Sequence, residues 1–165
     1  MGAKKQLEQN KREKPASMLS RTLSTGFFGG IFWSFIAWIA SYFHFTTVSP
    51  TTFIIRSWLD ADWTNSWLAD VLSILAVSVI SLLVAMVYYV LLRKTRGLLP
   101  SILFGLALWG GLFYLLLPIF PNVKPLTQLD SDTIVTTICI FILYGLFIGY
   151  SISYEYLDSI SKKNI

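Results

Sequence analysis

The chain has 165 residues, of which 55% are hydrophobic, 16% aromatic and only 13% charged, and its mean hydropathy is +0.62. A soluble domain of this size usually has about a quarter of its residues charged, because a small globule has much surface to hydrate. The composition therefore excludes an ordinary soluble domain and indicates that lipid forms part of the solvent. The net charge of +4 needs no nucleic-acid partner, since basic residues also set membrane topology.

Charged residues are absent from four stretches of the chain, namely 22–55, 71–92, 98–123 and 133–154. Each stretch reaches the roughly 20 residues that a helix needs to cross a hydrocarbon core. The pattern predicts an all-α integral membrane four-helix bundle, with a single membrane domain over residues 22–156. The expected spans are residues 25–45, 69–92, 98–117 and 133–154.

Polar tails flank the predicted membrane domain at residues 1–21 and 157–165. The first tail is basic and is expected to be flexible, so a cleaved secretory signal is the competing interpretation of the first span. The apolar stretch of that span is about twice as long as a signal-peptide core, and no typical cleavage site follows it. We therefore expect an uncleaved anchor.

The basic residues are distributed unequally between the two predicted faces of the membrane. One face would hold six from the N-terminal tail, three from the 93–97 turn and two from the C-terminal tail. The other face would hold only Arg56 and Lys124. Because lysine and arginine concentrate in cytoplasmic segments, we expect both termini to be cytoplasmic.

The first outer loop, residues 51–67, reads TTFIIRSWLDADWTNSW. Its apolar residues recur at about every fourth position, which is typical of one face of a helix. This face comprises Ile55, Trp58, Leu59, Trp63 and Trp67. Tryptophan favours the boundary between head groups and acyl chains, so the pattern predicts a short amphipathic helix on the outer surface.

The turn between the second and third spans is short, with Gly97 after its cations and Pro100 at the start of the next helix. Glycine commonly follows a helix end, and proline is tolerated in the first turn of a helix. A short turn joins neighbouring antiparallel helices. We therefore expect spans 2 and 3 to pack as a hairpin.

Small residues recur four positions apart in the first and last spans. These stripes are Gly26, Gly30 and Ser34, and Gly145, Gly149 and Ser153. Small residues let helix backbones approach closely in lipid, and the two antiparallel stripes would lie at matching depths. We expect spans 1 and 4 to pack along them. Homodimerisation through one stripe and chance occurrence of glycine remain alternatives.

Ionisable residues at central membrane depth mark ion paths and proton relays, and the four spans contain no Asp, Glu, Lys or Arg there. This argues against a proton-coupled transporter or a voltage sensor. His44 is expected at the interface, with a pH-sensing role left open. Cys139 is expected to be a small packing residue, and Tyr88 part of an interfacial aromatic belt.

Two D-x-D pairs occur in the predicted outer loops, at Asp60 with Asp62 and at Asp130 with Asp132. Paired carboxylates can bind a hard divalent cation if the loops converge, although the second pair is also suited to capping the fourth span. The sequence has no nucleophile elbow, phosphate-binding glycine loop or metalloprotease cluster. No catalytic, metal or cofactor residue is predicted, and we expect a protein that is not an enzyme.

The basic tail, TGFFGGIFWS, WLDADW and YGLFIGYSISYE together resemble the YqhR-like family, a group of uncharacterised four-span membrane proteins from Bacillus and relatives. The resemblance covers most of the chain and implies a bacterial cytoplasmic membrane location. It brings no catalytic or binding residues.

The preferred functional hypothesis is an accessory, scaffold or partner subunit that works through a membrane-protein partner or as a homo-oligomer. Its contact surfaces would be the basic tail and the tryptophan-rich segment. The alternative is a small transporter or channel component for a neutral or hydrophobic solute. An enzyme acting on lipid comes third, because it would need catalytic groups that the sequence does not provide.

Overall fold

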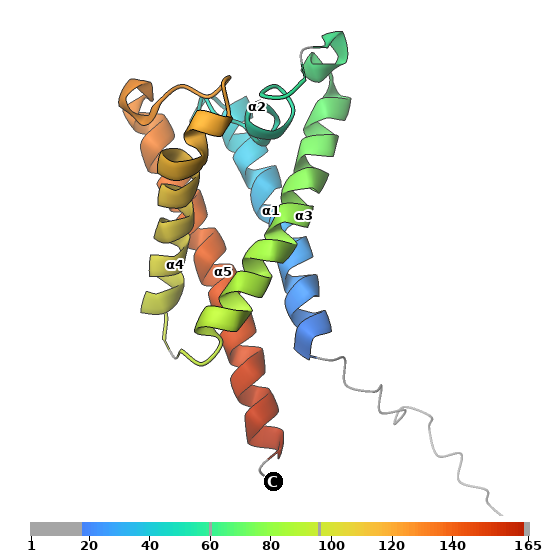
Figure 1. Ribbon diagram of the computed structural model, residues 1–165, viewed down its shortest axis with the longest axis vertical. Coiled ribbons are helices and arrows are strands. Elements are labelled where there is room, and N and C mark those ends of the chain that lie inside the picture. Colours follow the sequence, from blue (N-terminus) through green and yellow to red (C-terminus); the bar gives the residue numbers. More distant parts are fainter. Residues whose placement is uncertain (1–17, 60, 96, 164–165) are drawn as a thin grey trace, which may run out of the picture.

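A computed structural model describes residues 18–59, 61–95 and 97–163 of the chain. Four helices in it are long and apolar enough to cross a membrane, which confirms the expected all-α bundle of four spans. They are α1 (Met18–Tyr42), α3 (Trp67–Leu92), α4 (Leu99–Gly110) with its π-helical continuation (Gly111–Leu116), and α5 (Ser131–Lys163). The start of α1 and the end of α5 lie at one end of the bundle, here named the terminal end (Figure 1).

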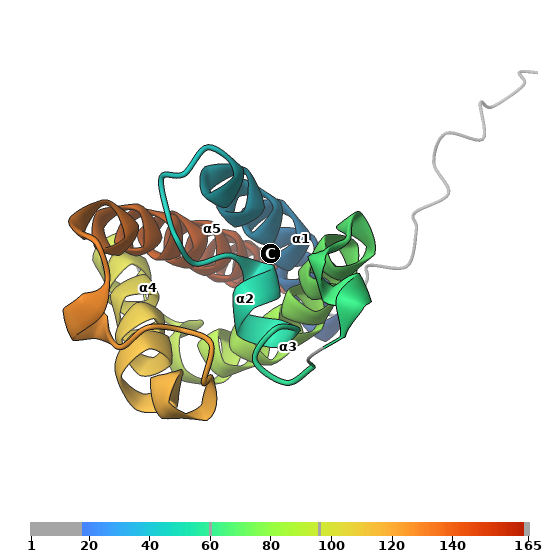
Figure 2. The ribbon, with the colours of Figure 1, turned by 90° about the horizontal axis from the view of Figure 1, so that it is seen from above.

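Short elements cover the opposite end of the bundle. They are α2 (Pro50–Ile54) and the 3-10 turns Asp62–Asn65, Leu117–Ile119 and Leu126–Gln128. The described residues of 43–66 and 117–130 are named the cap. Viewed from above, α2 lies across the space between the long helices (Figure 2).

Helices α1 and α3 pack closely through glycine. A Cβ atom on Gly26 would lie 2.7 Å from Ala85 Cβ, and one on Gly30 would lie 2.6 Å from Ser78 Cα. The Ser81 hydroxyl also donates a 2.6 Å hydrogen bond to the Gly26 carbonyl oxygen. Tight packing and hydrogen bonds of this kind hold helices together in lipid, where apolar contact alone gains little.

A second close contact joins α4 to α5. A Cβ atom on Gly145 would lie 2.6 Å from both the Gly105 Cα and the Ser101 carbonyl oxygen. Gly149, one turn further along α5, faces the Ser101 side chain. The bundle is therefore two helical hairpins, α1 with α3 and α4 with α5.

The expected pairing of the two small-residue stripes with each other is wrong. Helices α1 and α5 do meet, but there Gly29 faces Phe147 and Ile148. The physical reason is competition for the same faces, because each stripe is already packed against its hairpin partner, with Ser101 and Gly105 of α4 against the α5 stripe. A ridge of serine and alanine on α3 fills the α1 groove instead. Ser34 is buried and donates to Gly30 in its own helix, whereas the Ser153 hydroxyl lies 3.3 Å from the Tyr88 hydroxyl.

The expected hairpin of spans 2 and 3 is also wrong. Helices α3 and α4 meet near their connecting turn, where the Tyr88 and Phe104 rings have centroids 4.9 Å apart, and they diverge toward the cap (Figure 1). The short turn, with Gly97 at φ +103°, makes them neighbours only at this end. Most of the small residues of α3 and α4 face their hairpin partners, namely Ser78, Ser81 and Ala85 toward α1 and Ser101 and Gly105 toward α5.

The predicted amphipathic helix over 51–67 is broken into α2, a turn and a 3-10 turn. Helix α2 starts early, because Pro50 occupies its first turn and the Ser49 hydroxyl accepts from the Thr52 amide. Ile55, placed on the outer face by the pattern, is only 6% exposed. The side chains of Trp58, Leu59, Trp63 and Trp67 remain exposed.

Helix α1 ends at Tyr42 rather than at the expected residue 45, and His44 follows with φ 62°. The Phe45 amide donates to the Ala40 carbonyl oxygen at 2.9 Å, so α1 ends in a C-cap in which His44 has the left-handed conformation. His44 is exposed there and shapes the entry to the cap. At the other end of the chain, α5 continues to Lys163, well beyond the expected residue 154.

We predict that Gly30→Ala destabilises the protein, because its methyl group would overlap the α3 backbone at Ser78. Overpacking of this kind costs about 1–3 kcal/mol. Thermal unfolding in a mild detergent measures the effect. The matched control is Gly110→Ala, whose Cβ meets nothing within 4 Å. Its melting temperature should stay the same or rise, and a fall equal to that of Gly30→Ala would contradict the α1–α3 contact.

Candidate ligand-binding cavity

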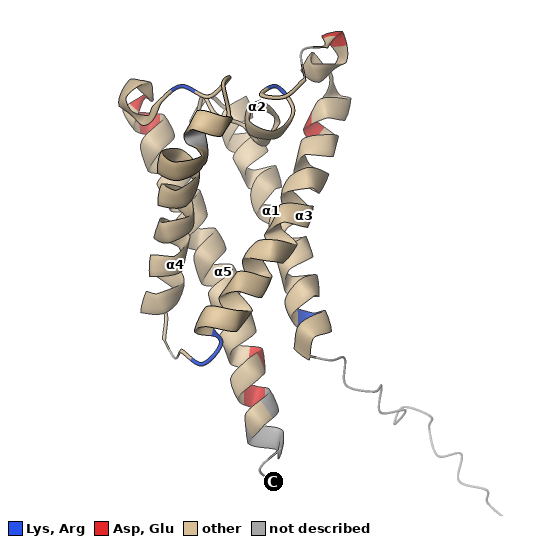
Figure 3. Ribbon diagram, in the orientation of Figure 1, with Lys and Arg blue, Asp and Glu red and all other residues tan. Residues whose placement is uncertain are grey.

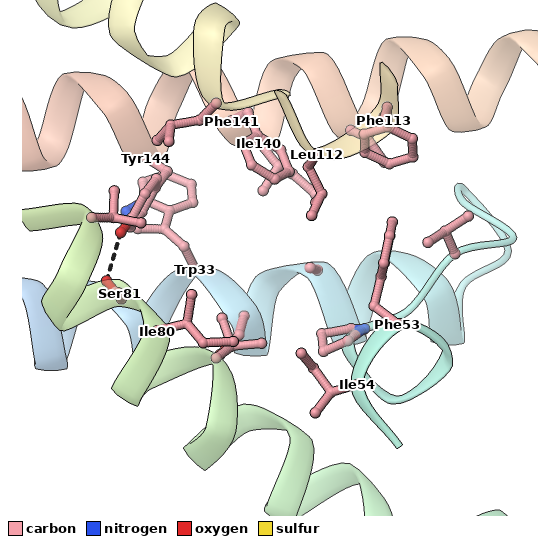
Figure 4. Close-up of a pocket in the computed structure, with 18 of the residues that line it drawn as sticks. Trp33, Phe53, Ile54, Ile80, Ser81, Leu112, Phe113, Ile140, Phe141 and Tyr144 are labelled. Carbon is pink, nitrogen blue, oxygen red and sulfur yellow. Dashed lines mark hydrogen bonds between the residues drawn. The ribbon is translucent and has the colours of Figure 1, made fainter. Parts of the chain in front are cut away.

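The divergence of α3 from α4 leaves a cavity of about 420 Å³ inside the bundle, between its centre and the cap. Small-molecule sites typically occupy roughly 300–1,000 Å³. All four long helices and the start of the cap contribute to its walls, as the close-up in Figure 4 shows. Representative lining residues are Trp33, Phe53, Ile54, Ile80, Leu112, Phe113, Ile140 and Phe141.

The mouth of the cavity is marked by lining residues that are still exposed. Ile80 on α3 is 47% exposed, and Leu116 at the end of the π-helical segment is 42% exposed. Ala107 on α4 also lines the cavity and is exposed. These residues stand on the two helices that diverge, so the cavity opens sideways between α3 and α4. In a membrane that opening faces the acyl chains.

The α4 wall changes helical type beside the cavity. Residues Gly111–Leu116 form a π-helical segment that follows the α-helical part of α4. Such segments are rare and often occur at functional sites. Gly111 lines the cavity, whereas Gly110 does not, and a Cβ on either would meet nothing within 4 Å. Glycine is therefore not needed here for close packing, and Gly111 adds no side chain to the cavity wall.

Hydroxyl groups on the walls are engaged with the protein itself. The Tyr144 hydroxyl lies 2.6 Å from the Ser81 oxygen, which joins the two hairpins at the end of the cavity nearest the membrane centre (Figure 4). Thr137 donates to the Thr133 carbonyl oxygen at 2.7 Å and accepts from the Trp109 indole at 3.0 Å. With these groups satisfied, the wall presents a mainly apolar surface.

One polar atom beside the cavity has no partner among the described residues. The Trp33 indole nitrogen is buried without a hydrogen bond. Leaving a buried donor unpaired costs about 1–3 kcal/mol. The cavity wall therefore contains an unpaired hydrogen-bond donor among apolar side chains.

Aromatic packing closes the cavity at the cap. The Phe53 ring meets the Phe113 and Phe120 rings edge-on, with centroids 5.4 and 5.3 Å away. Phe53 and Phe113 belong to a buried cluster that includes Val48, Val123 and Leu129. The Asn122 side chain donates to the Arg56 carbonyl oxygen, which ties the two segments of the cap together.

The terminal end of the bundle is sealed by Tyr88. Its side chain is fully buried, and its hydroxyl lies 3.2 Å from Ser101 and 3.3 Å from Ser153. The prediction that Tyr88 belongs to an exposed interfacial belt is therefore wrong, because α3 turns this side chain inward between α4 and α5.

Cys139 was expected to be a packing residue, and this expectation is wrong because its side chain is exposed on α5. The described members of the predicted D-x-D pairs lie in separate parts of the structure. Asp62 is in the 3-10 turn before α3, Asp130 and Asp132 flank the start of α5, and Asp60 lies outside the described residues. Within the described part of the chain, no group of three or more His, Cys, Asp or Glu side chains could hold a metal ion.

The sequence reasoning did not identify the cavity residues as a group. They come from segments more than a hundred residues apart, and individually they read as ordinary lipid-facing or core positions. The adjacent glycines at 110 and 111 were the available signal, because two glycines in an apolar helix leave space that neighbouring helices need not fill.

Comparison with known proteins gives one consistent result. The family described as "Conserved membrane protein YqhR" matches residues 2–165. The chain is also 46% identical over 168 residues to "Uncharacterized protein YqhR" of Bacillus subtilis (strain 168), which covers 99% of this chain and 94% of that protein. No solved structure shows significant similarity. The similarity covers nearly the whole chain, and the four candidate membrane spans agree with the description of the family. The chain therefore belongs to the YqhR family of conserved membrane proteins.

Proposed function

We propose that this protein is a non-enzymatic membrane protein that binds a hydrophobic molecule in the cavity between its two hairpins. This corresponds to the transporter-component hypothesis. The observation that carries it is the apolar cavity itself, which lies within the spans and opens between α3 and α4. Empty apolar space in a packed interior forfeits dispersion contacts, and a hydrophobic occupant recovers them.

The position of the mouth supports entry from the bilayer. Exposed lining residues stand on α3 and α4, while aromatic rings cover the cavity at the cap and Tyr88 seals the terminal end. A hydrophobic molecule dissolved in the membrane reaches such an opening without crossing water. Hydroxyls engaged within the protein leave the walls suited to holding such a molecule rather than to reacting with it.

A role as a partner subunit is a second proposal, supported by the exposed tryptophans of the cap. Trp58 is 66% exposed and Trp67 is 70% exposed. Tryptophan is enriched in protein interfaces as well as at membrane boundaries. Gentle crosslinking in the native membrane, purification and mass spectrometry test it, with Trp58→Ser as the variant that should lose the partner.

We further propose that the protein lies in the bacterial cytoplasmic membrane with its terminal end in the cytoplasm. Support comes from the basic residues of the 93–97 turn and both tails, set against Arg56 and Lys124 in the cap. The second basic group is small and accompanied by several acidic residues.

We predict that Gly111→Phe weakens binding of a hydrophobic fluorophore to the detergent-purified protein by about tenfold or more, equivalent to at least about 1.4 kcal/mol. The added ring fills the cavity from the α4 wall without a clash at its Cβ. Equilibrium titration measures the affinity.

Gly110→Phe is the matched control, because residue 110 is the adjacent glycine and does not line the cavity. Its affinity should stay within about twofold of the native protein, a change of only a few tenths of a kcal/mol. Equal loss in both variants, or no binding to the native protein, would remove the cavity as the functional site.

The orientation predicts opposite labelling of two single-cysteine variants in a Cys139→Ser background. Asn65→Cys in the cap should react with a membrane-impermeant maleimide in intact cells, whereas Lys94→Cys in the turn should react only after lysis. Both side chains are exposed, so accessibility depends on the side of the membrane. The reverse pattern would place the termini outside.

A further inference from the structure

We propose that the occupant of the cavity is an anionic amphiphile, whose acyl chain lies between α3 and α4 and whose acidic head group is held at the cap by Arg56 and Lys124. This proposal rests on the proposed function. It specifies that the ligand is negatively charged and that its head group lies at the cap. Its basis is the position of these two basic residues in the cap segments that line the cavity.

Each basic residue closely follows a part of the chain that lines the cavity. Ile54 lines it and Arg56 comes two residues later, while Phe120 lines it and Lys124 comes four residues later. Both basic side chains are exposed. Each cap segment that lines the cavity therefore carries an exposed basic side chain that a ligand can reach.

The two cap segments are also held against each other. Asn122 donates to the Arg56 carbonyl oxygen, and the Trp58 and Phe120 rings have centroids 6.5 Å apart. Arg56 itself makes a long 3.5 Å contact from its Nε to the Thr64 carbonyl oxygen, so the rest of its guanidinium can serve a ligand. The two cap segments that carry Arg56 and Lys124 therefore lie side by side at the cap end of the cavity.

The described acidic residues at this end of the bundle lie to either side of this pair. Figure 3 shows basic positions in the two middle segments of the cap and acidic positions at the outer ends of α3 and α5. One of these acids, Asp70, accepts a 2.5 Å hydrogen bond from Thr51 and is occupied by the structure. The negative charge of these acidic residues would repel an anion placed elsewhere on the cap.

This arrangement selects the chemistry of the occupant. An entirely apolar molecule would use the cavity but not the two cations, and a small anion would use the cations but not the apolar walls. A molecule with one acyl chain and one acidic group uses both, as a guanidinium and an ammonium form charge-assisted hydrogen bonds with phosphate or carboxylate. An acidic membrane lipid and a free fatty acid share this chemistry.

The test compares probes with the same chain and different heads on the full chain in a mild, uncharged detergent. One pair is monooleoyl phosphatidylglycerol and monooleoyl phosphatidylcholine, and the other is oleate and oleyl alcohol, each titrated by displacement of the hydrophobic fluorophore. We expect the anionic member of a pair to bind about tenfold more tightly at low salt, and the preference to shrink as sodium chloride is raised. The pair that shows the preference identifies a lipid or a free acid as the source.

The variant Arg56→Gln with Lys124→Gln should reduce the preference to about twofold or less while leaving the neutral probes unaffected, because only head-group contacts are removed. Lys94→Gln, an exposed basic residue at the opposite end of the bundle, is the control and should retain the preference. A preference that survives the double variant, or that Lys94→Gln abolishes equally, overturns the inference and leaves the cavity as a neutral site. Failure of every probe to displace the fluorophore, with Gly111→Phe also without effect, overturns the proposed function itself.

Discussion

Close backbone contact at glycine is the interaction on which the rest of the structure depends. Lipid is as apolar as leucine, so helices in a bilayer gain little by burying aliphatic side chains against each other. Gly26 and Gly30 bring α1 onto α3, and Gly105 and Gly145 bring α4 onto α5, each with atoms that leave no room for a methyl group. Where such contacts are absent, between α3 and α4, the helices diverge. The cavity thus lies where the helices do not pack closely.

The sequence predicted the number and approximate limits of the spans because insertion depends on the length and hydrophobicity of a segment, and both are local properties. It identified the glycines that pack but not their partners. A stripe such as Gly26 and Gly30 specifies a groove, whereas its partner depends on which ridge has the matching volume, here Ser78, Ser81 and Ala85. That is a property of two helices and cannot be read from one.

The same distinction explains what was missed in the candidate site. Apolar residues do recur at about every fourth position of residues 51–67. Phe53 and Ile55 are nevertheless buried against other parts of the structure, which the periodicity of one segment does not encode. The cavity is space bounded by side chains from distant parts of the chain, so its local sign was limited to the adjacent Gly110 and Gly111, of which Gly111 lines it. The basic residues at 56 and 124 were visible as exceptions to the charge distribution, although their proximity to an apolar cavity required the fold.

Each glycine-paired hairpin is continuous in the chain, one within residues 18–92 and the other within residues 99–163. The first pair of helices can consequently complete its contact before the second pair has left the ribosome. Assembly then requires only the docking of two preformed units, joined by the 93–98 turn as a tether. Severing that tether would separate the polypeptide into two fragments whose internal contacts are intact, which makes the protein suited to reconstitution from halves.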